Sequence, residues 1–385
     1  MTAYSNKKES GFMKAVVFVL CVFFKMMLIV SCFNNGNVST TADIQKVNIP
    51  IEHNVPSLHF PVGMTDDYIV YNTIDESEIV IFWKYDIKSS KSIEIGRIEK
   101  ARMWSGSFIL LDNKLFFTMG MIDEKSIHFM IDVEKGGVTE LSEDKEAHPL
   151  VYYSVVDEER YIKHIIGRNA DDEEISYIAL GNIDGTTETI IANQYPNPNK
   201  AGGTILNAKY FDGIIYTLEF RETEDTFKHY LCTYNLSGEE LSVEYISLLG
   251  DFLNTPDEIG ETYLPWEMEV WDNYYYVRTL GRTQIVLKKE NNEYKKIIPI
   301  SRDTYTDDDI QIVRRNSLIT KDETEFLFYN SNTRKFHIFD SETESITELN
   351  IDDTMNEEYF RYHFTDGKRL IYINDNNDVY LYKYN

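Results

Sequence analysis

The chain has 385 residues, 43% of them apolar and 14% aromatic, so it can bury a substantial core and is not intrinsically disordered. Its formal net charge is −26. No Lys/Arg-rich stripe interrupts this acidity, which excludes nucleic acid as an expected partner. Tyr and Phe number 27 and 21, and together with Ile, Val and Thr they favour strands over helices.

The first 32 residues are typical of a targeting segment and not of a folded domain. A basic start is followed by the apolar stretch Ala15–Val30, which Lys25 interrupts, and then by Ser31 and Cys32. The run Leu28–Cys32 resembles the end of a bacterial lipoprotein signal, in which the cysteine becomes lipidated after cleavage. The resemblance implies a signal over residues 1–32, a lipid on Cys32 and a flexible tether over residues 33–43. The alternative is a cleaved secretory signal or an uncleaved membrane anchor.

Beyond the tether, a turn containing Asp recurs about every 50 residues, each time between two apolar strands. The seven copies are Asp66-Asp67, Asp112-Asn113, Asp157-Glu158, Asp212-Gly213, Asp272-Asn273, Asp322-Glu323 and Asp366-Gly367. Two further strands follow most of these hairpins, so each unit is predicted to be a four-stranded antiparallel meander. A meander with this period is the blade of a β-propeller.

The last unit has only three strands, and the chain ends at Asn385 where a fourth would follow. The segment Ile44–Ile51 has no hairpin of its own and is expected to supply that strand, next to Val379–Tyr384. We therefore predict an all-β protein with one propeller domain over residues 44–385, built from seven blades, with six as the alternative. Pro50 removes a backbone donor and places the closing strand at the outer edge of its blade.

The signal-like start, the length and the aromatic meanders together resemble Gram-negative envelope lipoproteins that carry TolB-like propellers. The resemblance covers the whole chain and depends on pattern, without a signature motif. It implies a binding or scaffolding role in the periplasm or at the outer membrane. It transfers no catalytic residue to this sequence.

None of the common hydrolase, metalloprotease or nucleotide-binding motifs is present in the sequence. His128, His229 and His337 all fall in predicted third strands, but at different distances from the strand ends. They are therefore expected to pack and not to form a metal ring. No metal, cofactor or catalytic residue is predicted. Cys232, inside an apolar strand, is expected to be a small buried residue.

Long segments join the fourth strand of one unit to the first strand of the next. They are Arg97–Ser105, Ser142–Pro149, Ala192–Gly203, Leu248–Pro265 and Ser301–Asp309. Functional residues concentrate on long loops that a rigid scaffold holds. The ligand-binding residues predicted on this loop face are Trp104, Tyr195, Tyr263, Trp266 and Tyr305. Aromatic rings beside carboxylates suit a glycan or a protein of the envelope.

The preferred function is therefore a non-catalytic lipoprotein of the cell envelope that binds a ligand or a protein partner. The alternative is a propeller enzyme that acts on a polysaccharide. The enzyme would need two or more carboxylates, or a histidine, converging at the axis on the loop face.

Overall fold

The computed structural model divides the chain into two units, Met1–Ser39 and Thr40–Asn385. The structure describes residues 44–47, 60–74, 79–104, 107–121, 126–144, 147–168, 174–185, 188–194, 203–223, 226–247, 265–279, 284–297, 310–313, 319, 322–330, 333–349, 360–374 and 379–383. All of these belong to the second unit. Cys32, the signal segment and the tether lie outside the described residues.

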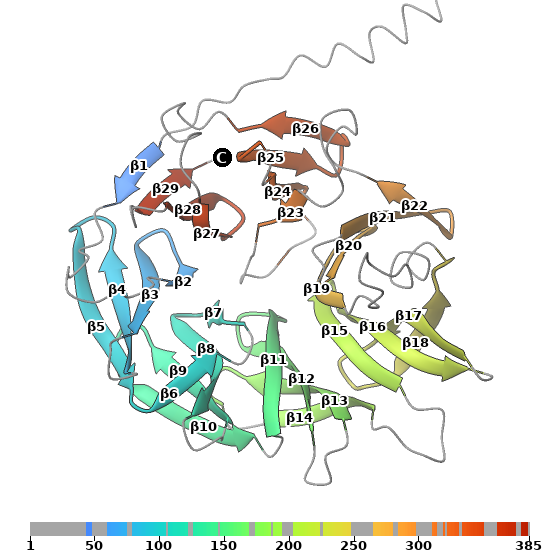
Figure 1. Ribbon diagram of the computed structural model, residues 1–385, viewed down its shortest axis with the longest axis horizontal. Helices are drawn as coiled ribbons and strands as arrows, with labels where there is room; N and C mark the ends of the chain where they lie inside the picture. Colours follow the sequence, from blue (N-terminus) through green and yellow to red (C-terminus); the bar gives the residue numbers. More distant parts are fainter. Residues whose placement is uncertain are drawn as a thin grey trace, which may run out of the picture. The chain divides into compact units, whose positions relative to one another are not determined.

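The described strands form seven antiparallel sheets that follow one another along the chain (Figure 1). The first sheet contains β2 (Phe60–Met64), β3 (Tyr68–Ile74), β4 (Val80–Asp86) and β5 (Lys91–Ile98). The second contains β6 (Ala101–Trp104), β7 (Ile109–Leu111), β8 (Lys114–Met121), β9 (Ser126–Asp132) and β10 (Val138–Asp144). The third contains β11 (Ala147–Val155), β12 (Arg160–Arg168), β13 (Glu174–Asn182) and β14 (Glu188–Gln194). Within each sheet, strands that are consecutive in sequence lie side by side, apart from the split β6 and β7, which both pair with β8.

The remaining sheets repeat this order. The fourth contains β15 (Gly203–Phe211), β16 (Ile214–Thr223), β17 (Thr226–Tyr234) and β18 (Glu240–Tyr245). The fifth contains β19 (Pro265–Trp271), β20 (Tyr274–Thr279), β21 (Gln284–Glu290) and β22 (Glu293–Ile297). The sixth contains β23 (Ile310–Ile312), β24 (Glu325–Asn330), β25 (Lys335–Asp340) and β26 (Ser345–Glu348). The seventh contains β27 (Phe360–Thr365), β28 (Arg369–Asn374), β29 (Val379–Lys383) and β1 (Ile44–Val47). The predicted all-β propeller of four-stranded meanders is confirmed.

All seven predicted Asp turns lie between the first and second strands of a sheet. The backbone at two of them explains the choice of residues. Asp112 and Asn113 have φ values of 41° and 61°, while Asp212 and Gly213 have 48° and 85°. Two consecutive residues with positive φ form the tight turn that matches the twist of a hairpin, and Asp, Asn and Gly tolerate it best.

The N-terminal strand closes the ring, as the sequence predicted. β1 pairs antiparallel with β29, with Ile44 opposite Tyr382 and Val47 opposite Val379, and it is the outermost strand of the seventh sheet (Figure 1). The strand ends at Val47, so Pro50 lies outside the described residues.

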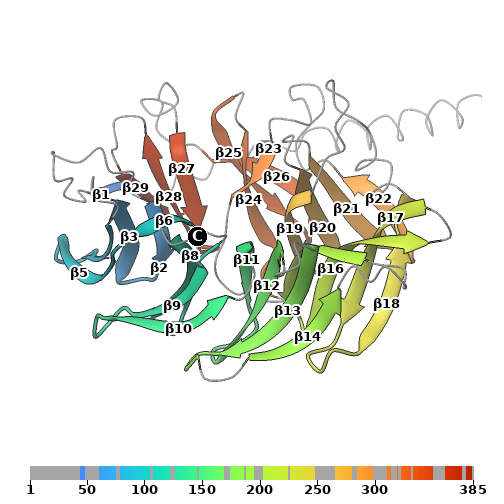
Figure 2. The ribbon, with the colours of Figure 1, turned by 60° about the horizontal axis from the view of Figure 1, so that its bottom comes forward.

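Apolar clusters lie between neighbouring sheets, whose arrangement Figure 2 shows from another side. At the junction of the last and first sheets, Ile371 and Leu381 pack with Ile69 and Tyr85. A larger cluster joins the fourth, fifth and sixth sheets around Trp271, whose ring centroid lies 4.1 Å from that of Phe326. Because a single sheet cannot bury both of its faces, this packing between sheets is the main source of stability.

Two of the segments predicted as long loops are largely strands. Trp104 was expected in a loop, but it ends β6 and lies opposite Met119 of β8. The first strand of the second sheet is thus split into β6 and β7. Because of this interruption, the sequence pattern did not identify β6 as part of the strand. Likewise, β10 extends to Asp144 and β11 begins at Ala147, within the segment predicted as a loop. No helix among the described residues is long and apolar enough to cross a membrane.

Candidate functional site

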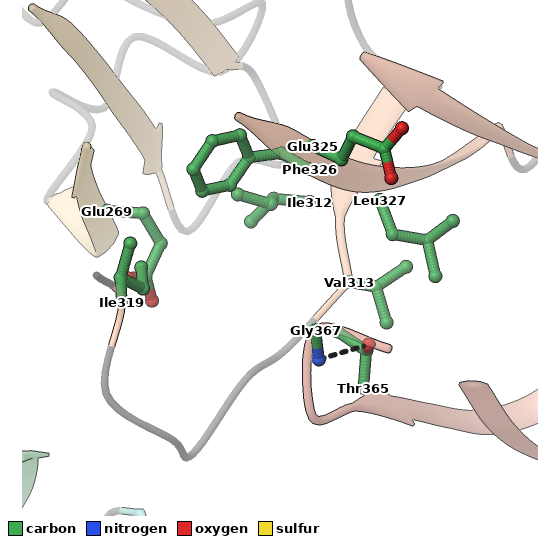
Figure 3. Close-up of a pocket in the computed structure, with 9 residues that line it drawn as sticks. All are labelled: Glu269, Ile312, Val313, Ile319, Glu325, Phe326, Leu327, Thr365 and Gly367. Atoms are coloured by element: carbon green, nitrogen blue, oxygen red, sulfur yellow. Dashed lines mark hydrogen bonds between the residues drawn. The ribbon is translucent and has the colours of Figure 1, made fainter. Parts of the chain in front are cut away.

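A small pocket lies where the fifth, sixth and seventh sheets meet (Figure 3). Its walls come from β19, from β23 and β24, and from the turn between β27 and β28. The residues lining it are Glu269, Ile312, Val313, Ile319, Glu325, Phe326, Leu327, Thr365 and Gly367. Its volume is about 20 Å³, which holds roughly one water molecule. This is far below the several hundred Å³ of a typical ligand pocket, so the described walls enclose no organic ligand.

The carboxylate of Glu269 is paired with a lysine from the neighbouring sheet. Lys209 Nζ on β15 donates to Glu269 Oε1 at 2.7 Å, and the two side chains are 19% and 9% exposed. Both residues lie on first strands, so the ion pair joins the fourth and fifth sheets at their inner edges. The Glu269 carboxylate is therefore already engaged by a cation of the neighbouring sheet.

Glu325, the second carboxylate of the pocket, does not converge with Glu269. The two side chains lie on opposite sides of the pocket, and the Glu325 carboxylate points away from the apolar side chains (Figure 3). Residue Glu325 is exposed overall, yet partial burial of its carboxyl group raises its pKa, and the nearby charge of Asp340 adds to this effect. The Glu269 carboxylate is thus held by Lys209 on its own side of the pocket, whereas Glu325 lies on the other side (Figure 3).

The structure does not test the predicted ligand-binding aromatics. Trp104 lies in β6 and Trp266 in β19, but their side chains are not among those described. Tyr195, Tyr263 and Tyr305 lie outside the described residues altogether. Whether these rings share one surface stays a prediction.

The three histidines predicted to pack are all buried in third strands. His128 on β9, His229 on β17 and His337 on β25 are 1%, 6% and 4% exposed. Burial lowers the pKa of His128 to about 3 and that of His229 to about 4, so both are neutral at physiological pH. Among the described residues, no group of three or more His, Cys, Asp or Glu side chains is placed to hold a metal ion.

His128 is the centre of a buried hydrogen-bond chain between the second and third sheets. Tyr153 Oη lies 2.5 Å from Nδ1, and Tyr161 Oη lies 3.0 Å from Nε2. Nδ1 also lies 3.3 Å from the carbonyl oxygen of Phe117, and a neutral imidazole carries one proton, so only one of the two ring nitrogens donates. Thr118 Oγ1 lies 2.7 Å from the Tyr153 hydroxyl and extends the network. These hydrogen bonds link His128 and Thr118 of the second sheet to Tyr153 and Tyr161 of the third, and so hold the two sheets together.

A second buried polar cluster, around Glu219 on β16, was not predicted from the sequence. The Glu219 carboxylate has no exposed surface and accepts hydrogen bonds from Thr217 Oγ1 at 2.6 Å, Tyr234 Oη at 2.7 Å and Arg221 Nε at 2.7 Å. Arg221 also donates to Glu240 on β18 at 2.6 Å. The alternation of Thr217, Glu219 and Arg221 is typical of a solvated strand face.

The expectation for Cys232 is confirmed, since its thiol is buried beside this Glu219 cluster. Burial, with a contribution from the Glu219 charge, raises the pKa of the thiol, which is therefore protonated and unreactive. Glu219, Glu269 and His128 are each held by partners on the same or a neighbouring sheet, and so join strands or sheets.

Comparisons with known proteins support the fold alone. No protein-family model matches the chain, and no curated protein matches it by sequence. The β-propeller domain of the Trilobed protease from Pyrococcus furiosus aligns with a TM-score of 0.51 and 12% identity, over 85% of this chain and 95% of that one. The acylaminoacyl peptidase of Pyrococcus horikoshii aligns with a TM-score of 0.52 and 11% identity over 82% of this chain. The aligned part is 49% of the peptidase.

The oligogalacturonate lyase of Vibrio parahaemolyticus also aligns, with a TM-score of 0.49 and 9% identity, over 89% of this chain and 98% of that one. The Pyrococcus furiosus domain is described as having an open velcro topology. In the present chain, β1 pairs with β29.

Proposed function

We propose that the protein is a lipid-anchored propeller of the cell envelope that binds a ligand or a protein partner and catalyses no reaction. The observation that carries the proposal is the use of the pocket's carboxylates. Glu269 is ion-paired with Lys209, and the Glu325 carboxylate points away from the apolar side chains of the pocket (Figure 3). We infer that these groups stabilise the ring and do not act as a catalytic pair.

The anchor is inferred from the sequence. The apolar run that ends at Ser31 leads directly to Cys32, and only 11 residues separate Cys32 from the first strand of the propeller. Lipidation of Cys32 would therefore hold the ring close to a membrane surface. A single lipid chain holds a protein on a membrane only weakly, so stable anchoring usually needs a second chain or another signal. A lipidated N-terminal cysteine of this kind carries more than one chain.

Metabolic labelling with a fatty-acid analogue tests the anchor. The unmodified sequence is expected to be labelled and to sediment with membranes, whereas Cys32→Ala should show neither. Cys232→Ala is the matched control, because Cys232 is buried in the propeller and should not affect labelling. Equal labelling of Cys32→Ala and the unmodified protein would refute the anchor.

The binding surface is tested with a panel of oligosaccharides. Tyr195, Tyr263 and Tyr305, which the sequence places in long loops, are replaced together by alanine, and binding is measured by calorimetry alongside thermal unfolding. The proposal expects binding by the unmodified protein and its loss in the triple variant, with a nearly unchanged melting temperature. Unchanged affinity and melting would contradict the loop face as the binding surface, and turnover of an oligosaccharide would favour the polysaccharide enzyme instead.

A further inference from the structure

We propose that β18, the outer strand of the fourth sheet, is a docking edge for an extended, basic segment of another protein. This surface lies on the rim of the fourth sheet and is independent of both the lipid and the loop-face ligand. The bound segment pairs with β18 as an additional antiparallel strand.

The first observation is the position of β18 in its sheet. The strand order is β15-β16-β17-β18, so β18 pairs with β17 on one side and with no other described strand. The backbone N–H and C=O groups along its outer edge therefore have no ladder partner in the part of the chain that the structure describes. Such an edge is a template for an added strand, which recurs as a mode of peptide recognition.

The second observation is an exposed apolar stripe on the same strand. Leu241, Val243 and Tyr245 are 50%, 40% and 47% exposed, and they occupy alternate positions, so they share one face. Other outer strands carry exposed charges that discourage pairing, such as Lys295 and Lys296 on β22. An alternating apolar strand therefore finds complementary side chains on β18.

The third observation is that the fold holds β18 in place from its other face. Thr233 Oγ1 lies 2.7 Å from Ser242 Oγ on the neighbouring strand. Glu244 accepts hydrogen bonds from Lys289 Nζ at 2.8 Å and from Tyr294 Oη at 2.7 Å, both in the fifth sheet. A preformed edge loses little conformational entropy when a segment binds to it.

Charge decides the occupant. A second copy of this chain also carries a net charge of −26, and exposed Glu239 lies immediately before β18, whereas Glu240 is already paired with Arg221. Two such edges repel each other, while a segment that alternates apolar residues with Lys or Arg is attracted to one. The partner is therefore a basic extended segment, and not a second copy.

The test uses the full-length protein and a fluorescent eight-residue peptide that alternates lysine and valine, followed by anisotropy. Saturable binding is expected, with at least tenfold weaker affinity for Val243→Lys and less than twofold change for Ile93→Lys. Ile93 is the matched control, because it is a 55% exposed apolar residue on another outer strand, β5. Thermal unfolding of both variants checks that they fold. If Val243→Lys does not fold, Val243→Thr replaces it in the binding measurement.

Two further peptides separate strand addition from simple charge attraction. N-methylation of alternate backbone amides removes the donors that a strand needs and should abolish binding, and a glutamate–valine peptide should not bind. Equal binding by the Val243 and Ile93 variants, or by the N-methylated peptide, would overturn the proposal. A dimer of the protein alone that Val243→Lys dissociates would overturn the assignment of the occupant.

Discussion

Arg369 Nη1 lies 3.3 Å from the carboxylate of Asp66, so an ion pair crosses the junction between the last and first sheets. The same guanidinium donates through Nε to Asp366 at 2.9 Å within its own turn. Asp66 is 93% exposed, whereas the side chain of Asp366 is 14% exposed and also accepts the backbone N–H of Arg369 at 2.8 Å. The two aspartates therefore differ in how strongly they hold the arginine.

This difference gives a matched pair of variants. Asp366→Ala should lower the free energy of unfolding by about 1.5–3 kcal/mol, since it removes hydrogen bonds to a charged group and leaves Arg369 poorly satisfied. Asp66→Ala should lower it by less than about 0.5 kcal/mol, because solvent screens an exposed pair. Urea unfolding measures both changes. A larger loss for Asp66→Ala than for Asp366→Ala would contradict the assigned roles.

Gly181 makes room for Tyr161 in the third sheet. A Cβ built on Gly181 would lie 2.5 Å from the Tyr161 ring, and the two residues are cross-strand partners. Gly181→Ala should therefore lower the free energy of unfolding by about 1–3 kcal/mol, through forced displacement of a fully buried ring.

The double variant separates this clash from other effects of the substitution. In a chain that already carries Tyr161→Ala, adding Gly181→Ala should cost much less than it does alone, because no ring remains to be displaced. Urea unfolding of the four proteins in the cycle measures the coupling. Strictly additive losses would show that Tyr161 is not the obstacle.

Burial of His128 makes stability depend on pH. Its folded-state pKa of about 3 is well below the unfolded value of about 6.5, owing first to burial and then to the nearby charge of Lys163. Between these two pKa values, His128 is protonated in the unfolded chain and neutral in the folded chain. Its contribution to the free energy of unfolding is therefore fully present above about pH 6.5 and decreases as the pH falls. The contribution of His128 falls by up to about 1.4 kcal/mol per pH unit.

The measurement combines urea unfolding at several pH values with ¹⁵N NMR of the imidazole. His128 is expected to stay neutral down to at least pH 4, as long as the protein remains folded. Titration of His128 near pH 6.5 in the folded protein would show that the imidazole is not buried as described.

The features predicted correctly from sequence are those that local chemistry determines. Asp-Gly and Asp-Asn turns require positive φ, and the spacing of these turns defined the sheets. The solitary strand Ile44–Val47 was recognisable because the last meander lacked a partner. The prediction that Trp104 lies in a loop was wrong. The first strand of its sheet is interrupted, so half of that strand was taken for a loop.

The polar groups inside the ring escaped prediction for a different reason. Glu219 alternates with Thr217 and Arg221, and this pattern is the same whether the face meets water or a neighbouring sheet. Only the packing of the third sheet against the fourth makes the face an interior one. Likewise, Lys209 and Glu269 are 60 residues apart and become partners only when two first strands lie side by side.

Thermal unfolding of two shortened chains tests whether the N-terminal strand closes the ring. A chain that starts at Thr40 retains β1, whereas one that starts at Glu52 lacks it and leaves the edge of β29 unpaired. Loss of β1 should cost several kcal/mol, enough to lower the melting temperature by about 5 °C or more, or to cause aggregation. The Thr40 chain should melt well above the Glu52 chain, and equal melting temperatures would rule out closure by β1.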